Sequence, residues 1–168
     1  MVSLSHLGYL ATAVATHALV GYTLGTLAFD APRAGVLGGV VADVDLFFPL
    51  AWEFPLTHRG LTHTGLAVGA ALAVAAVRSR AAAGGVGVDE TQSVSSARRT
   101  MSVGVGYASH LLIDSTTPMG VPLFYPLSTA RVGVQMGGHS GPATAALWLC
   151  CLAALWTRRR SGRLDEQT

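Results

Sequence analysis

The sequence places histidine and aspartate side chains in three closely spaced pairs, in a chain that carries few charges elsewhere. Neutral imidazole and carboxylate are ligands that suit zinc, manganese or iron, and two metals could share such a donor set. A metal held in this way can generate hydroxide near neutral pH, which is the chemistry of a hydrolase. The candidate ligands are Asp43 and Asp45, His58 and His63, His110 and Asp114, and, from the first apolar segment, His17.

The spacing within each pair decides which backbone would let both side chains reach one metal. His110 and Asp114 are four residues apart, so a helix places them on one face. Asp43 and Asp45 are two residues apart, so a regular helix points them in nearly opposite directions and extended backbone points them the same way. Both can serve one metal only if the helix unwinds there, and Pro49 is placed to help end it.

The third pair, His58 and His63, is five residues apart, and a straight helix would separate the two side chains. Thr62 could instead N-cap a helix that starts at His63, with His58 returning from the preceding turn. Arg59 is a candidate for holding an anionic substrate group such as phosphate. Candidates for hydrogen-bonding the metal ligands are Thr62, Ser109 and Thr116.

Two further histidines are weaker candidates. A lone histidine such as His6 is most often a packing or interfacial residue, and His139 lies in a glycine-rich loop, where a solvated histidine is ordinary. A purely structural ion-pair network is the alternative explanation for the three His/Asp pairs. Three paired sets in one chain favour a metal site over that alternative.

The composition places these ionisable residues in a membrane protein. Of the 168 residues, 51% are hydrophobic and only 12% are charged, whereas a soluble domain is about 25% charged. These values argue against a soluble enzyme and against disorder. The net charge of +2 gives no indication of nucleic-acid binding. Ionisable residues within membrane spans are costly, so they are functional candidates by default.

Charged residues divide the chain into apolar runs, and a bilayer span needs about 20 apolar residues. We expect an all-α, polytopic membrane helix bundle of about five spans. The Pro-rich stretch 118–131 is expected to be irregular or re-entrant, and residues 78–99 are expected to form a polar cytoplasmic loop. The expected spans are residues 2–29, 34–52, 60–77, 100–117 and 141–157.

These spans form one expected integral membrane domain, residues 1–160, followed by a polar C-terminal tail, residues 161–168. The first apolar run has no Lys or Arg before Arg33, so we expect a retained helix rather than a signal peptide. Glycines four residues apart predict close helix approaches at Gly21/Gly25 and Gly65/Gly69.

The arginines predict how the bundle is oriented in the cell membrane. With five alternating spans and a cytoplasmic C-terminus, two arginines lie outside, Arg59 and Arg131. The N-terminus is then outside, and the span ends that carry the three His/Asp pairs share the outer face. His17 needs only to lie partway down the first span to join them. The nine arginines inside are Arg33, Arg78, Arg80, Arg98, Arg99, Arg158, Arg159, Arg160 and Arg163.

Three segments around these residues resemble a known family: GGVVADVDLFF, THRGLTHTGLA and GYASHLLIDSTTPMGVPLFYP. They are similar to the motifs of the membrane-bound, metal-dependent hydrolase family of the YdjM type, the LexA-binding inner-membrane hydrolase-like proteins. The resemblance covers roughly residues 12–127. The hydrolase label of that family rests largely on its motifs, so the resemblance implies no substrate.

The resemblance implies roles position by position. The family's PDxD acids correspond to Asp43 and Asp45, and its N-terminal histidine corresponds to His17, with His6 as the alternative. Its HRxxTH and HxxxDxxTPxG segments correspond to His58, Arg59 and His63, and to His110, Asp114, Thr117, Pro118 and Gly120.

The chain departs from the family pattern at three places. Ala42 stands where the family has a proline, and Leu46 stands where some relatives have a histidine. No clear acidic residue follows Arg131, where relatives often have a glutamate, and His139 is a candidate substitute.

The first functional hypothesis is a membrane-embedded, metal-dependent hydrolase in which metal-activated water attacks an ester. A phosphoester or lipid-like substrate is favoured by Arg59 and by the membrane depth. Zinc is the first choice of metal, with manganese or iron as alternatives. The expected partners are membrane lipid and an unidentified, anionic substrate. The catalytic candidates are His58, Arg59 and Asp114, and the metal-ligand candidates are His17, Asp43, Asp45, His58, His63, His110 and Asp114.

Two other classes of function remain open. A non-enzymatic membrane binding or regulatory protein would use the cluster as a structural metal or ion-pair core, with a closed coordination shell. A small ion- or proton-coupled transporter would need polar residues through the full membrane depth, and ranks last because the inner halves of the spans are apolar.

Overall fold

The part of the chain that the structure describes is helical. A computed structural model describes residues 4–49, 51–82, 90–137 and 139–165, and over these ranges it has helices, turns and one isolated β-bridge, Val121 to Val132. The all-α prediction is confirmed. The helices are α1 (Leu4–Phe29), α2 (Pro32–Val41), η1 (Ala42–Phe47), η2 (Leu61–His63), α3 (Gly65–Ala82), α4 (Glu90–Ser115) and α5 (Gly141–Asp165), where η marks a 3₁₀ helix.

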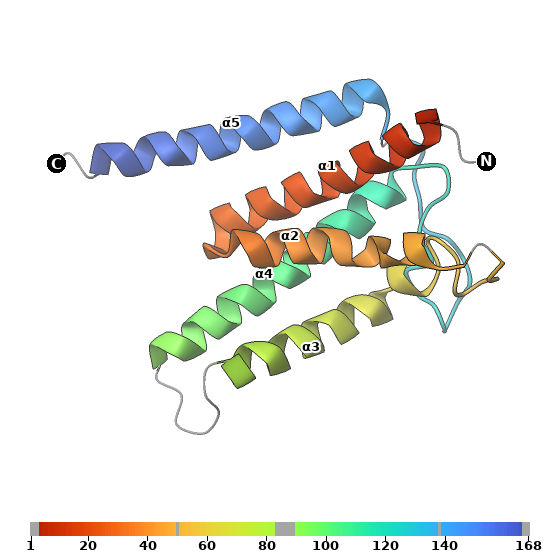
Figure 1. Cartoon of the computed structure of the whole chain (residues 1–168), viewed down its shortest axis with the longest axis horizontal. Helices are drawn as coiled ribbons and strands as arrows, with labels where there is room; N and C mark the ends of the chain where they lie inside the picture. Colours follow the sequence, from red (N-terminus) through yellow and green to blue (C-terminus); the bar gives the residue numbers. More distant parts are fainter. Residues whose placement is uncertain (1–3, 50, 83–89, 138, 166–168) are drawn as a thin grey trace.

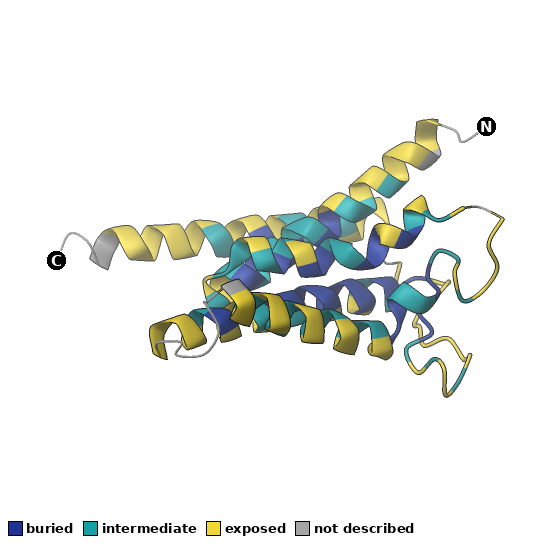
Figure 2. Cartoon of the chain, turned by 60° about the horizontal axis from the view of Figure 1, so that its bottom comes forward, coloured by how far each residue is buried: buried dark blue, intermediate teal, exposed yellow. Residues whose placement is uncertain are grey.

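Three helices form the centre of the molecule. Helices α1, α2 and α4 pack against one another, with α3 beside α4 and α5 along the other flank of α1 (Figure 1). Buried residues lie where these helices meet, whereas the outer side of α3 and the C-terminal half of α5 are exposed (Figure 2). A small apolar core is formed by Ala42 of η1, Tyr107 and Leu111 of α4, and Val121.

One described helix is long and apolar enough to cross a membrane. It is residues Leu7–Phe29 of α1, which agrees with the expected first span. The expected second span, residues 34–52, is interrupted, because α2 ends at Val41 after ten residues. Ten residues extend about 15 Å, which is half of a hydrocarbon core of about 30 Å. The bundle of five spans is therefore not confirmed.

The polar stretch 78–99 is largely helical, so its prediction as a loop was wrong. Helix α3 continues to Ala82 and α4 starts at Glu90; the residues between, 83–89, lie outside the described part of the chain. Polar side chains are typical of a loop between two helices, but they are equally compatible with the exposed end of a helix. The prediction of an irregular Pro-rich stretch, 118–131, is confirmed; its depth in a membrane is a separate matter.

Glycine allows the central helices to approach closely. A Cβ atom on Gly21 of α1 would overlap the carbonyl oxygen of Gly35 of α2, and a Cβ atom on Gly35 would overlap the carbonyl oxygen of Gly21. A Cβ atom on Gly25 would lie 2.6 Å from Oγ of Ser102 in α4. The predicted helix approach at Gly21/Gly25 is therefore confirmed.

The second predicted glycine pair does not lie at such a contact. A Cβ atom on Gly65 would meet only the carbonyl oxygen of Leu123, at 3.2 Å, and a Cβ atom on Gly69 would meet no described atom within 4 Å. Spacing alone cannot separate the two pairs, because it does not say which side of a helix faces a neighbour.

The glycine contact gives a test of the helix packing. We predict that Gly35→Ala lowers the free energy of unfolding by about 1–3 kcal/mol, because the new methyl group forces α1 and α2 apart. Thermal unfolding of the purified protein in detergent, followed by circular dichroism, measures the change. The matched variant Gly69→Ala should be unchanged or slightly more stable, since alanine favours helix over glycine. Equal melting temperatures for the two variants would contradict this account.

Candidate metal centre

The chain unwinds at the two aspartates. Helix α2 gives way at Ala42 to the 3₁₀ turn η1, in which Asp43 and Asp45 are both buried while Val44 between them is 46% exposed. A regular helix would have turned one carboxylate away. The structure therefore meets the condition that the sequence set for both aspartates to serve one site, namely that the helix unwinds here.

The irregular chain after η1 brings several groups onto Asp45. His58 places Nδ1 2.8 Å from Oδ1, and Thr62 donates its hydroxyl to Oδ2 at 2.6 Å. The backbone amide of Arg59 donates to the same oxygen at 2.9 Å, and Nδ1 of His63 lies 3.1 Å from it. Asp45 therefore fixes both histidines of the HRxxTH segment.

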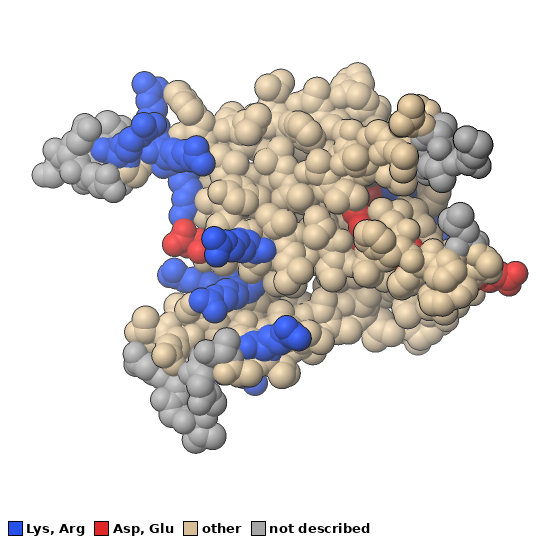
Figure 3. Space-filling model, in the orientation of Figure 1, with Lys and Arg blue, Asp and Glu red and all other residues tan. Residues whose placement is uncertain are grey.

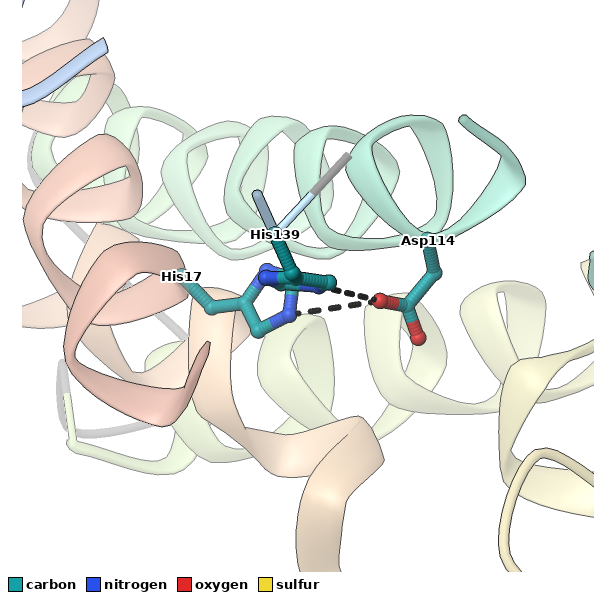
Figure 4. A group of neighbouring side chains, drawn as sticks. All are labelled: His17, Asp114 and His139. Carbon is teal, nitrogen blue, oxygen red and sulfur yellow. Dashed lines mark hydrogen bonds and ion pairs between the residues drawn. The ribbon is translucent and has the colours of Figure 1, made fainter. Parts of the chain in front are cut away.

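Asp114, on the last turn of α4, lies at the centre of the cluster and is 1% exposed. His17 of α1 and His139, just before α5, both point at its Oδ1 atom (Figure 4). Three groups lie near Oδ1: Nη2 of Arg59 at 2.8 Å, Nε2 of His139 at 3.0 Å and Nε2 of His17 at 3.4 Å. Two imidazoles lie near Oδ2: Nε2 of His63 at 3.2 Å and Nε2 of His110 at 3.6 Å.

Hydrogen bonding fixes the tautomers of two central histidines. Nδ1 of His110 lies 2.7 Å from the carbonyl oxygen of Gly39, which only accepts, so this nitrogen carries the proton. Nδ1 of His63 faces the Asp45 carboxylate and likewise donates. Each neutral ring then has a lone pair on Nε2, and these two atoms face each other at 3.1 Å. Two lone pairs this close require a cation or an additional proton between them.

Two buried ligand atoms are left without a hydrogen-bond partner among the described residues. They are Oδ2 of Asp43 and Nδ1 of His17. The His17 ring stacks on that of His110 with centroids 3.7 Å apart, so both rings border the same space. Buried polar atoms normally have partners, and a metal ion or its ligands would supply them here.

The two aspartates of η1, which lies outside the α1 span, have opposite electrostatic surroundings. Burial raises the pKa of Asp43, and the nearby histidines offset only part of this effect. Burial also acts to raise the pKa of Asp45, but hydrogen bonds from His58, His63 and Thr62 outweigh it and hold that pKa below its ordinary range. The ionised form of Asp43 therefore has too few nearby positive charges and hydrogen-bond donors to offset its burial, and a bound cation would stabilise it.

Four overlapping sets of three residues place their ligand atoms within 4.8 Å of one another. All predicted metal ligands except Asp45 belong to at least one set, and Asp45 instead holds two of the ligands in place. His139 also belongs to one set. Its glycine-rich loop favours a solvated histidine, whereas the resemblance makes it a candidate substitute for the missing acidic residue. The sets are His17, Asp114 and His139; His17, Asp43 and His110; Asp43, His58 and His63; and His63, His110 and Asp114.

Arg59 has a different position from the one expected. Its guanidinium is buried, donates to Asp114 at 2.8 Å and donates to the hydroxyl of Thr117, so it neutralises Asp114 rather than standing free for an anionic group. Arg59 and His139 both have positive φ, 56° and 60°. Such backbone is uncommon for residues with a side chain, and here both instances aim a donor at one carboxylate oxygen.

The predicted hydrogen-bonding residues have mixed outcomes. Thr62 supports the centre through Asp45, but it does not N-cap a helix. The N-cap of helix α3 is instead Thr64, whose hydroxyl accepts a hydrogen bond from the amide of Ala67 in the first turn of that helix. The hydroxyls of Ser109 and Thr116 donate to backbone carbonyls within their own segments, to residues 106 and 113. For these two, the prediction of a contact with the metal ligands was wrong.

Comparison with known proteins gives one match. The YdjM inner membrane protein family matches the chain over residues 4–165. No curated protein and no solved structure matches it.

The position of His17 gives a test that separates it from His6, the alternative N-terminal ligand. We predict that His17→Ala lowers the metal bound per chain, because His17 belongs to two of the ligand sets. Elemental analysis of purified protein, after equilibration with zinc and removal of excess, measures the content. His6→Ala is the matched control and should keep the wild-type value. Loss of metal in His6→Ala, with none in His17→Ala, would overturn the assignment.

Proposed function

The chain belongs to the YdjM inner membrane protein family, and on this premise we propose that it is a membrane-embedded, metal-dependent hydrolase of an ester. The observation that carries the proposal is the pair of imidazole nitrogens, Nε2 of His63 and of His110, facing each other beside Asp114. The substrate we propose is a phosphoester or lipid-like compound.

The donor set fits a divalent metal, with zinc as the first choice and manganese or iron as alternatives. A cation bound there supplies Lewis-acid activation of water near neutral pH. Each of the four ligand sets shares at least one residue with another set, and Asp114 belongs to two of them, so the cluster would also suit two metals. Asp45 and the carbonyl of Gly39 hold the ring tautomers that make His63 and His110 ligands. The proposed ligands are His17, Asp43, His63, His110 and Asp114, and His58 is proposed as the acid–base group beside them.

In the proposed reaction, the oxygen of a water molecule bonds to the carbonyl carbon or the phosphorus of the ester. The bond from that atom to the leaving oxygen breaks, and the leaving oxygen takes a proton. His58 is the candidate to move this proton, because its side chain is 34% exposed while His63 and His110 are fully buried. Its Nδ1 is held by Asp45, which leaves Nε2 to accept and return a proton.

The second candidate is a non-enzymatic membrane binding or regulatory protein with a structural metal or ion-pair core. The density of charged contacts on Asp114 favours it, since Arg59 and several imidazoles converge on one carboxylate. In the ion-pair form, one of the two facing imidazoles carries a second proton and donates to the other.

We further propose that the centre lies toward the outer face of the inner membrane, with the C-terminus in the cytoplasm. Arginine side chains gather at one end of the molecule (Figure 3), whereas η1 and the last turn of α4, which carry the aspartates of the cluster, lie toward the other end (Figure 1). The excess of arginine on the cytoplasmic side of membrane proteins supports this orientation.

Reporter fusions test the orientation. We predict that green fluorescent protein fused after residue 168 is fluorescent, and that alkaline phosphatase at the same position is inactive, because the latter folds only outside the cytoplasm. A phosphatase fused ahead of residue 1 behind a signal sequence should be active. The reverse pattern would place the metal centre on the cytoplasmic side.

Two substitutions test the catalytic roles. We predict that His58→Ala keeps its metal and lowers kcat by about 10²-fold or more, since it removes only proton transfer. Asp114→Ala should lose both metal and turnover, because Asp114 contacts most of the centre. Metal content and initial rates are measured together, with 4-nitrophenyl phosphate and 4-nitrophenyl acetate as substrates. An active, metal-replete Asp114→Ala protein would refute the hydrolase proposal.

A further inference from the structure

A groove runs between α1 and α5 and ends at the candidate metal centre. Its volume is about 370 Å³. Small residues, Gly8 and Ala13 of α1 and Gly141 and Ala145 of α5, leave the space open, and Tyr9 and Trp148 form its walls. A Cβ atom added at Gly8 or at Gly141 would meet no described atom within 4 Å, so the groove is open at both glycines.

The groove adjoins the candidate metal centre. Tyr9, Ala13 and His139 line it and also line a much smaller cavity, of about 20 Å³, that contains Asp43 and Asp114. The rings of Tyr9 and His139 meet edge to face at this junction, with centroids 6.1 Å apart. His139 therefore has one face toward the groove while its Nε2 atom contacts Asp114 at 3.0 Å (Figure 4).

The lining of the groove is mainly hydrocarbon, although Tyr9, Thr12, Thr144 and His139 are among its residues. Nε1 of Trp148 donates to the hydroxyl of Thr16 at 2.9 Å, and the hydroxyl of Thr12 donates to the carbonyl of Gly8 at 2.8 Å. These polar atoms are already occupied. Because Gly8 and Ala13 also lie within the apolar span Leu7–Phe29, the surroundings of the groove are suited to an aliphatic chain.

We propose that this groove binds one aliphatic chain of an amphiphilic ester, whose ester group enters the metal centre past Tyr9 and His139. The inference rests on the proposed hydrolase function and names the substrate class for it. The volume is at the low end of ligand pockets, about 300–1,000 Å³, and so suits one chain rather than two. Chain binding positions the ester, which is how remote contacts aid a reaction.

The experiment measures chain binding without requiring turnover. The full chain carries Trp52→Phe and Trp156→Phe, so that Trp148 is its single tryptophan, and is placed in phosphatidylcholine vesicles. Dodecanoate brominated in mid-chain is added, and quenching of Trp148 fluorescence is followed. A matched protein keeps only Trp156, which is 54% exposed and does not line the groove. Saturable quenching is expected at Trp148, and only gradual, non-saturating quenching at Trp156.

Two variants fill the groove, Gly8→Leu and Ala145→Leu, and Gly69→Leu on α3 is the matched control because its position is equally open. We expect each filling variant to raise the half-saturating probe concentration about tenfold, since methylenes of the probe are excluded from the groove. The control should change it less than about twofold. The same variants should raise KM for 4-nitrophenyl dodecanoate and leave KM for 4-nitrophenyl acetate unchanged.

The outcomes separate this inference from the proposed function. Equal, non-saturating quenching at both tryptophans, or no change in either filling variant, would overturn the groove inference even if the protein hydrolyses 4-nitrophenyl acetate. Saturable quenching that only the filling variants weaken would support chain binding even if no ester is hydrolysed, and in that case the hydrolase proposal fails alone. If Gly8→Leu does not fold, Ala145→Leu gives the same comparison from the other helix.

Discussion

The whole arrangement depends on one buried carboxylate. Asp114 is almost completely removed from solvent, and an isolated buried charge is costly enough that it must be paired or bind a metal. Its partners come from α1, from the segment before α3, from the segment before α5 and from α4 itself, at distances of 2.8 to 3.6 Å. Segments far apart in the sequence are therefore fixed around this single side chain.

The same constraint explains why glycine recurs between the central helices. His17 on α1 stacks on His110 of α4, and both helices pack against α2, which leads into η1 and Asp43. Gly39 of α2 contacts both of these helices. A Cβ atom on Gly39 would overlap the carbonyl oxygen of His17, and the carbonyl of Gly39 accepts a hydrogen bond from His110. The helix packing and the tautomer of a candidate ligand thus depend on one residue without a side chain.

The sequence was informative where chemistry is local and less so where it depends on the path of the chain. The helical pair His110 and Asp114 and the unwinding at Asp43 followed from spacing alone, because helix periodicity decides which side chains share a face. The contribution of His139 did not, since a histidine in a glycine-rich loop gives no indication of which segment it will contact. Residue type likewise predicted that Arg59 would pair with a negative charge, but it did not indicate that this charge is the carboxylate of Asp114. The expectation of five spans rested on the hydrophobicity of each run, and hydrophobicity does not predict that α2 ends after ten residues.

The cluster is unevenly satisfied, and this asymmetry bears on function. Around Asp114, Arg59 and His139 both contact Oδ1, and around Asp45 both carboxylate oxygens accept hydrogen bonds. Facing Asp43 the situation is reversed, with an orphaned carboxylate oxygen and an orphaned His17 nitrogen. A core built only for stability would have no reason to leave that side incomplete, since unpaired buried polar groups cost about 1–3 kcal/mol each. A centre that exchanges ligands needs such an incomplete side. Here Asp43 and His17 line the small cavity that adjoins the groove between α1 and α5.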